Sequence, residues 1–188
     1  MVPVIAIAGF AWTVFICYWT INSIAGEKKE KAEVNWIPVG IFLIIVILAF
    51  AALQQVPEEI LLMRMIPDDY ITGGLGLGKI AIGLSFAVWA RMHLADQWTS
   101  IPAINEEHRL IRTGPYKYLR HPIYAGVLAG LWGTAVVFGN LLVLVLPLLL
   151  TIGFFIKARY EEQMMEDEFG DEYLDYKKNT KMLIPGIL

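Results

Sequence analysis

Residue types that could do chemistry gather in two stretches of the sequence. Residues 91–124 hold all three histidines with several arginines and tyrosines, and residues 157–176 are rich in glutamate and aspartate. The histidines are 15 and 13 positions apart and match no zinc template, and the single cysteine, Cys17, lies in a distant apolar segment. Ser100 is the only serine near the histidines, and it lies in no strand–turn–helix elbow. No glycine-rich phosphate loop follows a strand. The pattern therefore argues against a metal site, a serine hydrolase and a phosphate-binding loop.

Both stretches also have an ordinary interpretation, as the basic loops and solvated charged tail of a membrane protein. That interpretation suits the acidic residues farther along the tail, which are Glu166, Asp167, Glu168, Asp171 and Glu172. Glu161 and Glu162 differ, because they follow an apolar helix by about one turn and face the other polar stretch. We expect their helix to end near Phe169-Gly170, since glycine favours a helix C-cap.

The elements that must position these residues are membrane helices. Of the 188 residues 57% are hydrophobic, and residues 1–26, 34–57, 70–90 and 122–156 contain a single charged residue, Lys79. A soluble domain distributes its charges over every element, because every element needs a hydrated face. The sequence therefore predicts an all-α polytopic membrane protein. It excludes a soluble enzyme, a disordered chain and a disulfide-rich secreted domain.

Five crossings follow from the apolar segments, because about 20 apolar residues cross a bilayer as a helix. Residues 122–156 would form a helix of about 52 Å, too long for one crossing, and Phe138-Gly139-Asn140 offers a turn in the middle. The predicted crossings are 2–24, 36–53, 71–90, 122–138 and 141–156, the last two forming a hairpin.

Smaller features accompany the crossings. Gly74 and Gly78 form a small-xxx-small pair that predicts close helix contact. Lys79 either extends toward the interface or faces a polar cavity. Residues 57–65 resemble a short interfacial helix. The simplest organisation is one membrane domain, 1–188, with three helices in 1–90 and the chemistry-bearing half in 91–188.

Lysine and arginine orient the chain. Thirteen of the fifteen fall in residues 25–35, 91–121 and 157–188, which five crossings place on one side of the membrane. Because basic loops stay in the cytoplasm, we expect both polar stretches and the C-terminus there and the N-terminus outside. The net charge of −3 gives no reason to expect a nucleic acid partner.

The residues from Tyr116 to Gly126, which read YKYLRHPIYAG, are followed by Glu161-Glu162 and then by FGDEY at 169–173. This arrangement resembles the isoprenylcysteine carboxyl methyltransferase family. The shared pattern is R-H-P-x-Y-x-G, an apolar hairpin, E-E and F-G-x-x-Y, and it covers roughly residues 91–188. It is less specific for substrate, because phospholipid methyltransferases and some sterol reductases are similar.

The resemblance implies S-adenosylmethionine as the methyl donor and S-adenosylhomocysteine as the product. In the family the donor lies in a cytoplasmic pocket closed by the R-H-P segment and the E-E helix. Carried over by motif, its contacts would be His108, Arg109, Leu110, Ile111, Tyr116, Arg120, His121, Pro122, Tyr124 and Glu161. Arg91 matches an arginine that holds the substrate carboxylate, so Arg91 and Glu161 are the implied catalytic residues. No metal is implied.

The residue types suit this chemistry. Glu161 can pair with the donor's ammonium, Arg120 or His121 with its carboxylate, and tyrosine rings with its adenine or sulfonium. A carboxylate acceptor is already ionised at neutral pH and needs orientation, which contributes about 7–11 kcal/mol, rather than a general base. A prenyl chain gains roughly 0.8 kcal/mol per buried CH₂ and would stay in the bilayer. The expected partners are therefore a prenylcysteine-like lipid substrate and membrane lipids.

Three alternatives stay open. Methylation of a phospholipid or other small amphiphile would require a base if the acceptor is an amine. The reductase similarity suggests hydride transfer from a nicotinamide cofactor. A membrane scaffold or channel would bind no cofactor, so substituting Glu161 or His121 would remove no binding.

Overall fold

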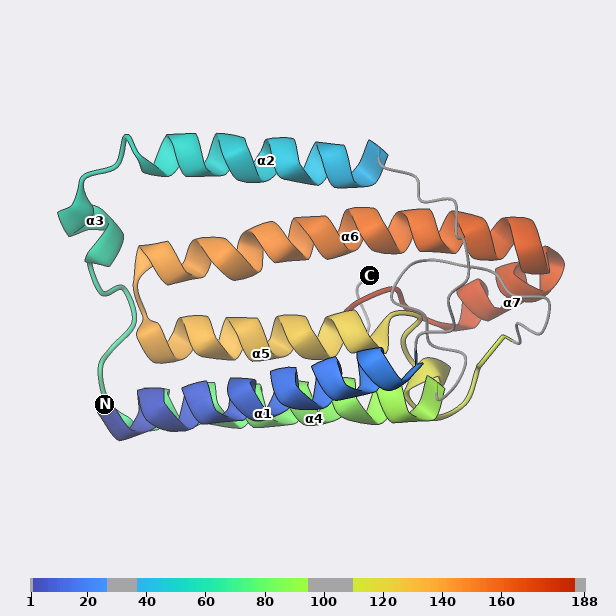
Figure 1. Cartoon of the computed structure of the whole chain (residues 1–188), viewed down its shortest axis with the longest axis horizontal. Coiled ribbons are helices and arrows are strands. Elements are labelled where there is room, and N and C mark those ends of the chain that lie inside the picture. Colours follow the sequence, from blue (N-terminus) through green and yellow to red (C-terminus); the bar gives the residue numbers. More distant parts are fainter. Residues whose placement is uncertain (1, 27–36, 95–109, 185–188) are drawn as a thin grey trace.

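Five long helices lie side by side in the computed structural model of the chain, which describes residues 2–26, 37–94 and 110–184 (Figure 1). They are α1 (Val2–Gly26), α2 (Ile37–Leu53), α4 (Tyr70–Leu94), α5 (Pro122–Phe138) and α6 (Leu141–Phe169). The shorter elements are α3 (Glu58–Leu62), the 3-10 helix η2 (Gly114–Lys117) and α7 (Asp171–Asn179). The described part of the chain is all-helical, apart from isolated β-bridges that join Arg64 to Asn140 and Leu119 to Lys181.

The outer surface of the helices is apolar. Three of the helices, α1, α4 and α6, are long and apolar enough to cross a membrane, and α2 and α5 are apolar helices of 17 residues. Large hydrophobic side chains point outward along them, for example Phe10 (70% exposed), Leu75 (69%) and Ile82 (73%). An apolar surface this extensive suits lipid rather than water, so the chain is an integral membrane protein.

Successive long helices run in opposite directions, so their termini gather at the two ends of the bundle (Figure 1). The N-terminus, α3 and the turn between α5 and α6 lie at one end. At the other end lie the last turns of α4 and α6, the first turn of α5, η2 and α7. We call this second end the polar end, made of residues 91–94, 110–124 and 157–184. Its cytoplasmic location stays a prediction.

Helices α4 and α5 approach each other through glycines. A Cβ atom placed on Gly83 would lie 2.6 Å from the Gly126 oxygen, and one on Gly126 would lie 2.6 Å from the Gly83 oxygen. Gly76 and Gly133 repeat this reciprocal approach at 2.9 and 2.8 Å. Because the absence of a side chain lets two helix backbones meet, these four glycines set the spacing of the central helix pair.

The prediction that Gly74 and Gly78 make close helix contact is wrong. Nothing lies within 4 Å of a Cβ atom on either glycine. The face of α4 that meets α5 carries Gly76 and Gly83, and the residues at 74 and 78 lie outside it. Lys79 is also exposed.

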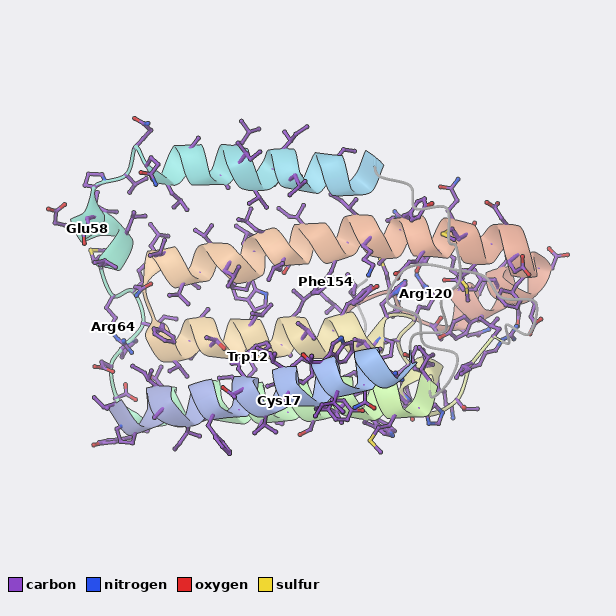
Figure 2. The ribbon with its side chains drawn as sticks, viewed as in Figure 1. Trp12, Cys17, Glu58, Arg64, Arg120 and Phe154 are labelled. Atoms are coloured by element: carbon purple, nitrogen blue, oxygen red, sulfur yellow. The ribbon has the colours of Figure 1, made fainter. Side chains whose placement is uncertain are left out.

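Helix α1 packs on the α4–α5 pair. Its buried side chains, Val4, Ala8 and Phe15, belong to one hydrophobic cluster with Ile80, Leu84, Ala87 and Val137. The Trp12 indole nitrogen donates a hydrogen bond of 2.9 Å to the Thr134 hydroxyl on α5 (Figure 2). This contact satisfies two polar groups within an otherwise apolar interface.

Arg64 caps the end of α5 that is remote from the polar end (Figure 2). Its guanidinium donates to the Phe138 and Val137 carbonyls at 2.7 and 3.1 Å. These carbonyls have no partner within the helix, and a cation at a helix C-terminus is also favourable to the helix dipole. Gly139 then turns the chain with a φ of 68°, and the Asn140 side chain caps α6 by accepting from the Val143 nitrogen at 3.0 Å.

Helix α6 is longer than the hydrocarbon of a bilayer is thick. Its 29 residues span about 44 Å at 1.5 Å per residue, more than the hydrocarbon thickness of about 30 Å. Residues 141–156 carry no charge, and Lys157 is the first charged residue of the helix. The charged remainder of the helix, residues 157–169, brings Glu161 and Glu162 to the polar end.

Candidate active site

Most of the residues predicted for the site come together at the polar end. Arg91 lies in the last turn of α4, Tyr116 lies in η2, and Glu161 lies on the extended part of α6. The segments that lead into η2 and α5 supply Leu110, Ile111, Arg120 and His121, and the first turn of α5 supplies Pro122 and Tyr124. His108 and Arg109 lie outside the described residues.

Glu161 is the centre of a hydrogen-bonded group. Its Oε1 accepts from the Tyr124 hydroxyl at 2.7 Å, and its Oε2 lies 3.3 Å from His121 Nδ1. Lys157, one turn earlier on α6, places its Nζ 3.7 Å from Oε1. The Glu161 side chain is 20% exposed, so a ligand can reach the carboxylate.

Tyr124 is held by stacking as well as by its hydroxyl. Its ring lies parallel to the His121 ring with centroids 5.4 Å apart, and parallel to the Phe154 ring with centroids 4.7 Å apart. Phe154 lies between α5 and α6 (Figure 2). The Lys157 ammonium lies 5.2 Å from the Tyr124 ring centroid. These contacts orient the tyrosine hydroxyl, and through it the Glu161 carboxylate.

Glu162 has a different environment, with its side chain only 2% exposed. Its Oε1 accepts from Arg120 Nε, and its Oε2 lies 3.3 Å from Lys177 Nζ on α7. The Arg120 guanidinium also donates to the Thr180 carbonyl at 2.6 Å. Arg120 and Glu162 therefore tie α6 to the start of α5 and to the end of α7. Removing Glu162 would leave Arg120 as a buried charge without its carboxylate partner.

The two glutamates determine the charge state of His121. Burial alone would lower the pKa of His121, but the hydrogen bond to Glu161 and the charges of both glutamates outweigh burial and raise it. Burial also raises the pKa of the Glu162 carboxyl, and His121 and Arg120 counter this and bring it to about 2. For Glu161, His121 and Lys157 outweigh burial, so its pKa is lowered. Both carboxylates are therefore ionised at neutral pH.

Tyr116 connects the α4 side of the site with Glu161. Burial raises the pKa of its hydroxyl, Tyr176 raises it further, and Arg91 acts in the opposite direction. The Glu161 charge also raises it, so the Tyr116 hydroxyl lies within electrostatic range of both predicted catalytic residues. Tyr116 and Arg91 are 7% and 8% exposed. The hydroxyl of Tyr176, on α7, donates to the Tyr116 carbonyl at 2.6 Å and so holds η2 in place.

His93 supports the turn that carries Tyr116, although the sequence assigned it no role. Its Nε2 lies 2.8 Å from the Thr113 hydroxyl. Gly114 has a φ of 59°, and a Cβ atom there would lie 2.7 Å from the His93 ring. Glycine at this position therefore serves both the backbone conformation and the packing of the histidine.

Residues 180–183 also belong to the site, and the sequence motifs did not indicate this. Backbone hydrogen bonds of 2.8–3.2 Å join Lys181 and Met182 to the segment 118–121, immediately before α5. Met182 and Leu183 are buried against Ala158, Tyr124 and Phe155. The one available signal was an apolar Met-Leu-Ile run after a charged helix. This C-terminal segment holds the R-H-P segment in place.

The sequence of this chain is similar to those of known methyltransferases. Residues 71–172 match the family described as phospholipid methyltransferase. The probable protein-S-isoprenylcysteine O-methyltransferase of Oryza sativa subsp. indica is 30% identical over 143 residues, covering 74% of each chain. The protein-S-isoprenylcysteine O-methyltransferase of Schizosaccharomyces pombe is 31% identical over 129 residues, covering 67% of this chain and 54% of the relative.

A bacterial relative matches more closely over a shorter region. Methanethiol S-methyltransferase 1 of Bradyrhizobium diazoefficiens is 42% identical over 71 residues, covering 37% of this chain and 24% of the relative. The chain thus spans between about a quarter and three quarters of the length of these relatives.

The fold is similar to that of a solved membrane protein. The eukaryotic intramembrane Ras methyltransferase ICMT superposes with a TM-score of 0.61 at 21% identity, covering 98% of this chain and 68% of that chain. This likeness supports the arrangement of the helices.

Proposed function

Because the chain belongs to the isoprenylcysteine carboxyl methyltransferase family, we propose that it transfers a methyl group from S-adenosylmethionine to the carboxylate of a prenylated cysteine. One observation carries the proposal: Glu161, Tyr124 and His121 form a single cluster just beyond the apolar part of α6. At that level a charged, water-soluble donor and a lipid-anchored acceptor can both be accommodated.

The described residues fit such a donor. Glu161 is ionised, partly exposed and oriented by Tyr124 and His121, which suits an ammonium group. His121 Nε2 is buried and lies 3.7 Å from Glu162 Oε1, so His121 contacts both glutamates. Tyr116, Pro122, Leu110 and Ile111 would contact the nucleoside. S-adenosylmethionine would supply an electrophilic methyl group on a sulfonium.

The two buried ionic groups have different proposed roles. Arg91 would hold the acceptor carboxylate, and its 8% exposure means that water competes weakly for it. Arg120 is already bound by Glu162 and the Thr180 carbonyl, so we assign it the positioning of the donor site rather than a direct contact with substrate. Because the acceptor is ionised at neutral pH, these residues orient it and exclude water and need not remove a proton.

The membrane arrangement belongs to the same proposal. Helices α1, α2, α4, α5 and α6 would each cross the bilayer, with α5 and the first part of α6 as a hairpin. The polar end and the C-terminus would be cytoplasmic and the N-terminus outside. A prenyl chain lying in the hydrocarbon would then present its carboxylate at the polar end.

Methyl transfer in detergent tests this function. Purified protein is incubated with radiolabelled S-adenosylmethionine and S-farnesyl-cysteine, and the product is then treated with base. We expect label that base releases, because a methyl ester is hydrolysed under these conditions. The matched acceptor in which a carboxamide replaces the carboxylate should take up no label. Absence of base-labile label from the carboxylate acceptor would reject the substrate assignment.

A phospholipid or other small amphiphile is the second candidate acceptor. The match to the phospholipid methyltransferase family and to a methanethiol S-methyltransferase favours it. An amine or thiol must lose a proton before it can accept a methyl group, so its methylation rate would fall at low pH. A carboxylate acceptor would show no such dependence on its own ionisation near neutral pH. Incubation with phosphatidylethanolamine and with farnesyl-cysteine, each over a pH series, separates the two.

Cofactor binding separates the remaining alternatives. Isothermal titration with S-adenosylhomocysteine and with NADPH should give binding of the first alone. Binding of NADPH without binding of S-adenosylhomocysteine would indicate a reductase. Binding of neither would favour a scaffold or channel, and a Glu161→Ala variant would then behave as wild type.

A further inference from the structure

Lys157 occupies the position on α6 where a lipid-anchored acceptor would leave the hydrocarbon. Residues 141–156 carry no charge, so a prenyl chain alongside this part of the helix would meet no charged side chain of α6 before Lys157. Its carboxylate, which must stay hydrated or paired, would lie just past the apolar part. Lys157 is the first cation at that depth on α6.

Exposure distinguishes Lys157 from the other cations near the cluster. The side chains of Arg120 and His121 are 8% and 11% exposed, and Arg91 is 8% exposed as a residue. Lys177 is 31% exposed but is bound by both Glu162 and Glu166. The Lys157 side chain is 41% exposed. An acceptor approaching from the bilayer can therefore reach Lys157 without displacing a buried ion pair.

The partners of Lys157 link it to the donor site. Its Nζ lies 3.7 Å from Glu161 Oε1 and 5.2 Å from the centroid of the Tyr124 ring. Under the proposed function, Glu161 receives the ammonium of the donor. Lys157 and the donor would then share the single Glu161 carboxylate, which leaves an excess of positive charge beside the lipid. An anionic acceptor would compensate that charge, whereas a neutral one would not.

We propose that Lys157 is the residue that captures the carboxylate of the lipid acceptor, and that it makes the site selective for anionic acceptors. The inference rests on the proposed function and deepens it. Arg91, buried on α4, would act after capture, on the carboxylate in its reacting position. Loss of Lys157 should therefore raise KM for the acceptor, while loss of Arg91 should lower kcat.

The test uses three variants of the full-length protein in lipid nanodiscs. Lys157→Gln removes the charge, Lys157→Arg keeps it, and Arg159→Gln is the matched control. Arg159 is an exposed cation two residues farther along α6, with its Cζ 5.4 Å from the Phe155 ring centroid and no ion pair to Glu161 among the described contacts. Binding of S-farnesyl-cysteine and of its carboxamide is measured with and without saturating S-adenosylhomocysteine.

Wild type should bind the carboxylate about tenfold more tightly than the carboxamide when S-adenosylhomocysteine is present, as expected for a charge-assisted hydrogen bond. Lys157→Gln should lose this preference, and KM for the carboxylate should rise by a similar factor while affinity for S-adenosylhomocysteine is retained. Lys157→Arg and Arg159→Gln should keep the preference.

The outcomes separate this inference from the proposed function. Wild type could methylate farnesyl-cysteine while Lys157→Gln keeps the wild-type preference for the carboxylate over the carboxamide. In that case Lys157 has no role in capture, and the methyltransferase assignment stands. An equal loss of preference in Arg159→Gln would show a general surface-charge effect and would also reject the inference. If wild type forms no methyl ester at all, the function itself fails.

Discussion

The adjacent residues Glu161 and Glu162 have different environments in this protein. Glu161 is partly exposed and shared among Tyr124, His121 and Lys157, while Glu162 is buried and held by Arg120 and Lys177. The sequence E-E predicted that one of them faces the ligand but not what the other does. On a helix, neighbouring residues point about 100° apart. Glu161 therefore faces the Tyr124 and His121 rings, whereas Glu162 faces Lys177 on α7. That second direction could be assigned only once α7 and the C-terminal segment were placed.

Substituting each glutamate by glutamine should separate binding from stability. Glu161→Gln should weaken S-adenosylhomocysteine binding by about ten- to a hundredfold, the range for a hydrogen bond to a charged group, with little change in Tm. Glu162→Gln should destabilise the fold by about 3–5 kcal/mol, because Arg120 would remain buried without its partner. Titration calorimetry and thermal unfolding in the same detergent measure both effects. Similar Tm losses in the two variants would contradict the assigned roles.

The raised pKa of His121 predicts opposite effects of pH on stability and on donor binding. Because the folded pKa lies above the ordinary value of 6.5, protonated His121 contributes stability that is complete below that value and is lost as pH rises through the folded pKa. Under the proposed function, the ammonium group that S-adenosylmethionine and S-adenosylhomocysteine share would compete with protonated His121 for Glu161. We therefore expect S-adenosylhomocysteine to bind more tightly as pH rises through the same window.

Titration calorimetry in two buffers of different ionisation enthalpy measures this effect directly. Binding to wild type should release a proton when the pH lies below the raised pKa of His121. A His121→Asn variant should release none from this site, and its affinity should vary less with pH. Proton uptake by wild type, or the same pH dependence in both proteins, would be inconsistent with competition for Glu161.

At the scale of helices, the sequence located the elements better than it located their contact faces. The turn at Phe138-Gly139-Asn140 separates α5 from α6 in the structure, and the C-cap at Gly170 ends α6. Glycine spacing, in contrast, selected Gly74 and Gly78, while the contact uses Gly76 and Gly83. Both pairs recur at helical spacing in one glycine-rich helix. The contact face is decided by Gly126 and Gly133 of α5, so it cannot be predicted from the sequence of α4 alone.

Replacing a glycine at the α4–α5 contact and one outside it by alanine tests which face of α4 meets α5. Gly83→Ala should lower stability by about 1–3 kcal/mol, the usual cost of overpacking, because its Cβ would approach the backbone of α5. Gly78→Ala should be neutral or stabilising by up to about 1 kcal/mol, since alanine is the better helix former and nothing lies nearby. Thermal unfolding in detergent compares the two. Equal destabilisation by both substitutions would argue that α4 is rotated from the described position.

At the scale of the whole molecule, alternating helix direction gathers the chemistry at one end. Hydropathy alone predicted the apolar helices, since 57% of the chain is hydrophobic and the charges are confined to a few gaps. It could not predict that residues 180–183 return to pair with residues 118–121, because so short a segment carries no periodicity. Nor could it reveal how His93 packs on Gly114, which depends on two segments more than twenty residues apart.

Cysteine labelling in intact cells tests the predicted orientation. With Cys17 replaced by serine, Glu58→Cys should react with a membrane-impermeant maleimide from outside, because α3 lies at the end opposite the polar end. Asp171→Cys, at the start of α7, should react only after the membrane is permeabilised. The reverse pattern would place the active site outside and contradict the distribution of lysine and arginine.

The pairing of residues 180–183 with the segment before α5 has a consequence for biosynthesis. A nascent chain whose helices α1 to α6 have been inserted still lacks the backbone segment to which the His121 amide is hydrogen-bonded. The proposed donor pocket is thus completed only after residues 180–183 have left the ribosome, later than the helices that they pack against. Partly synthesised molecules would reside in the membrane without holding a methyl donor.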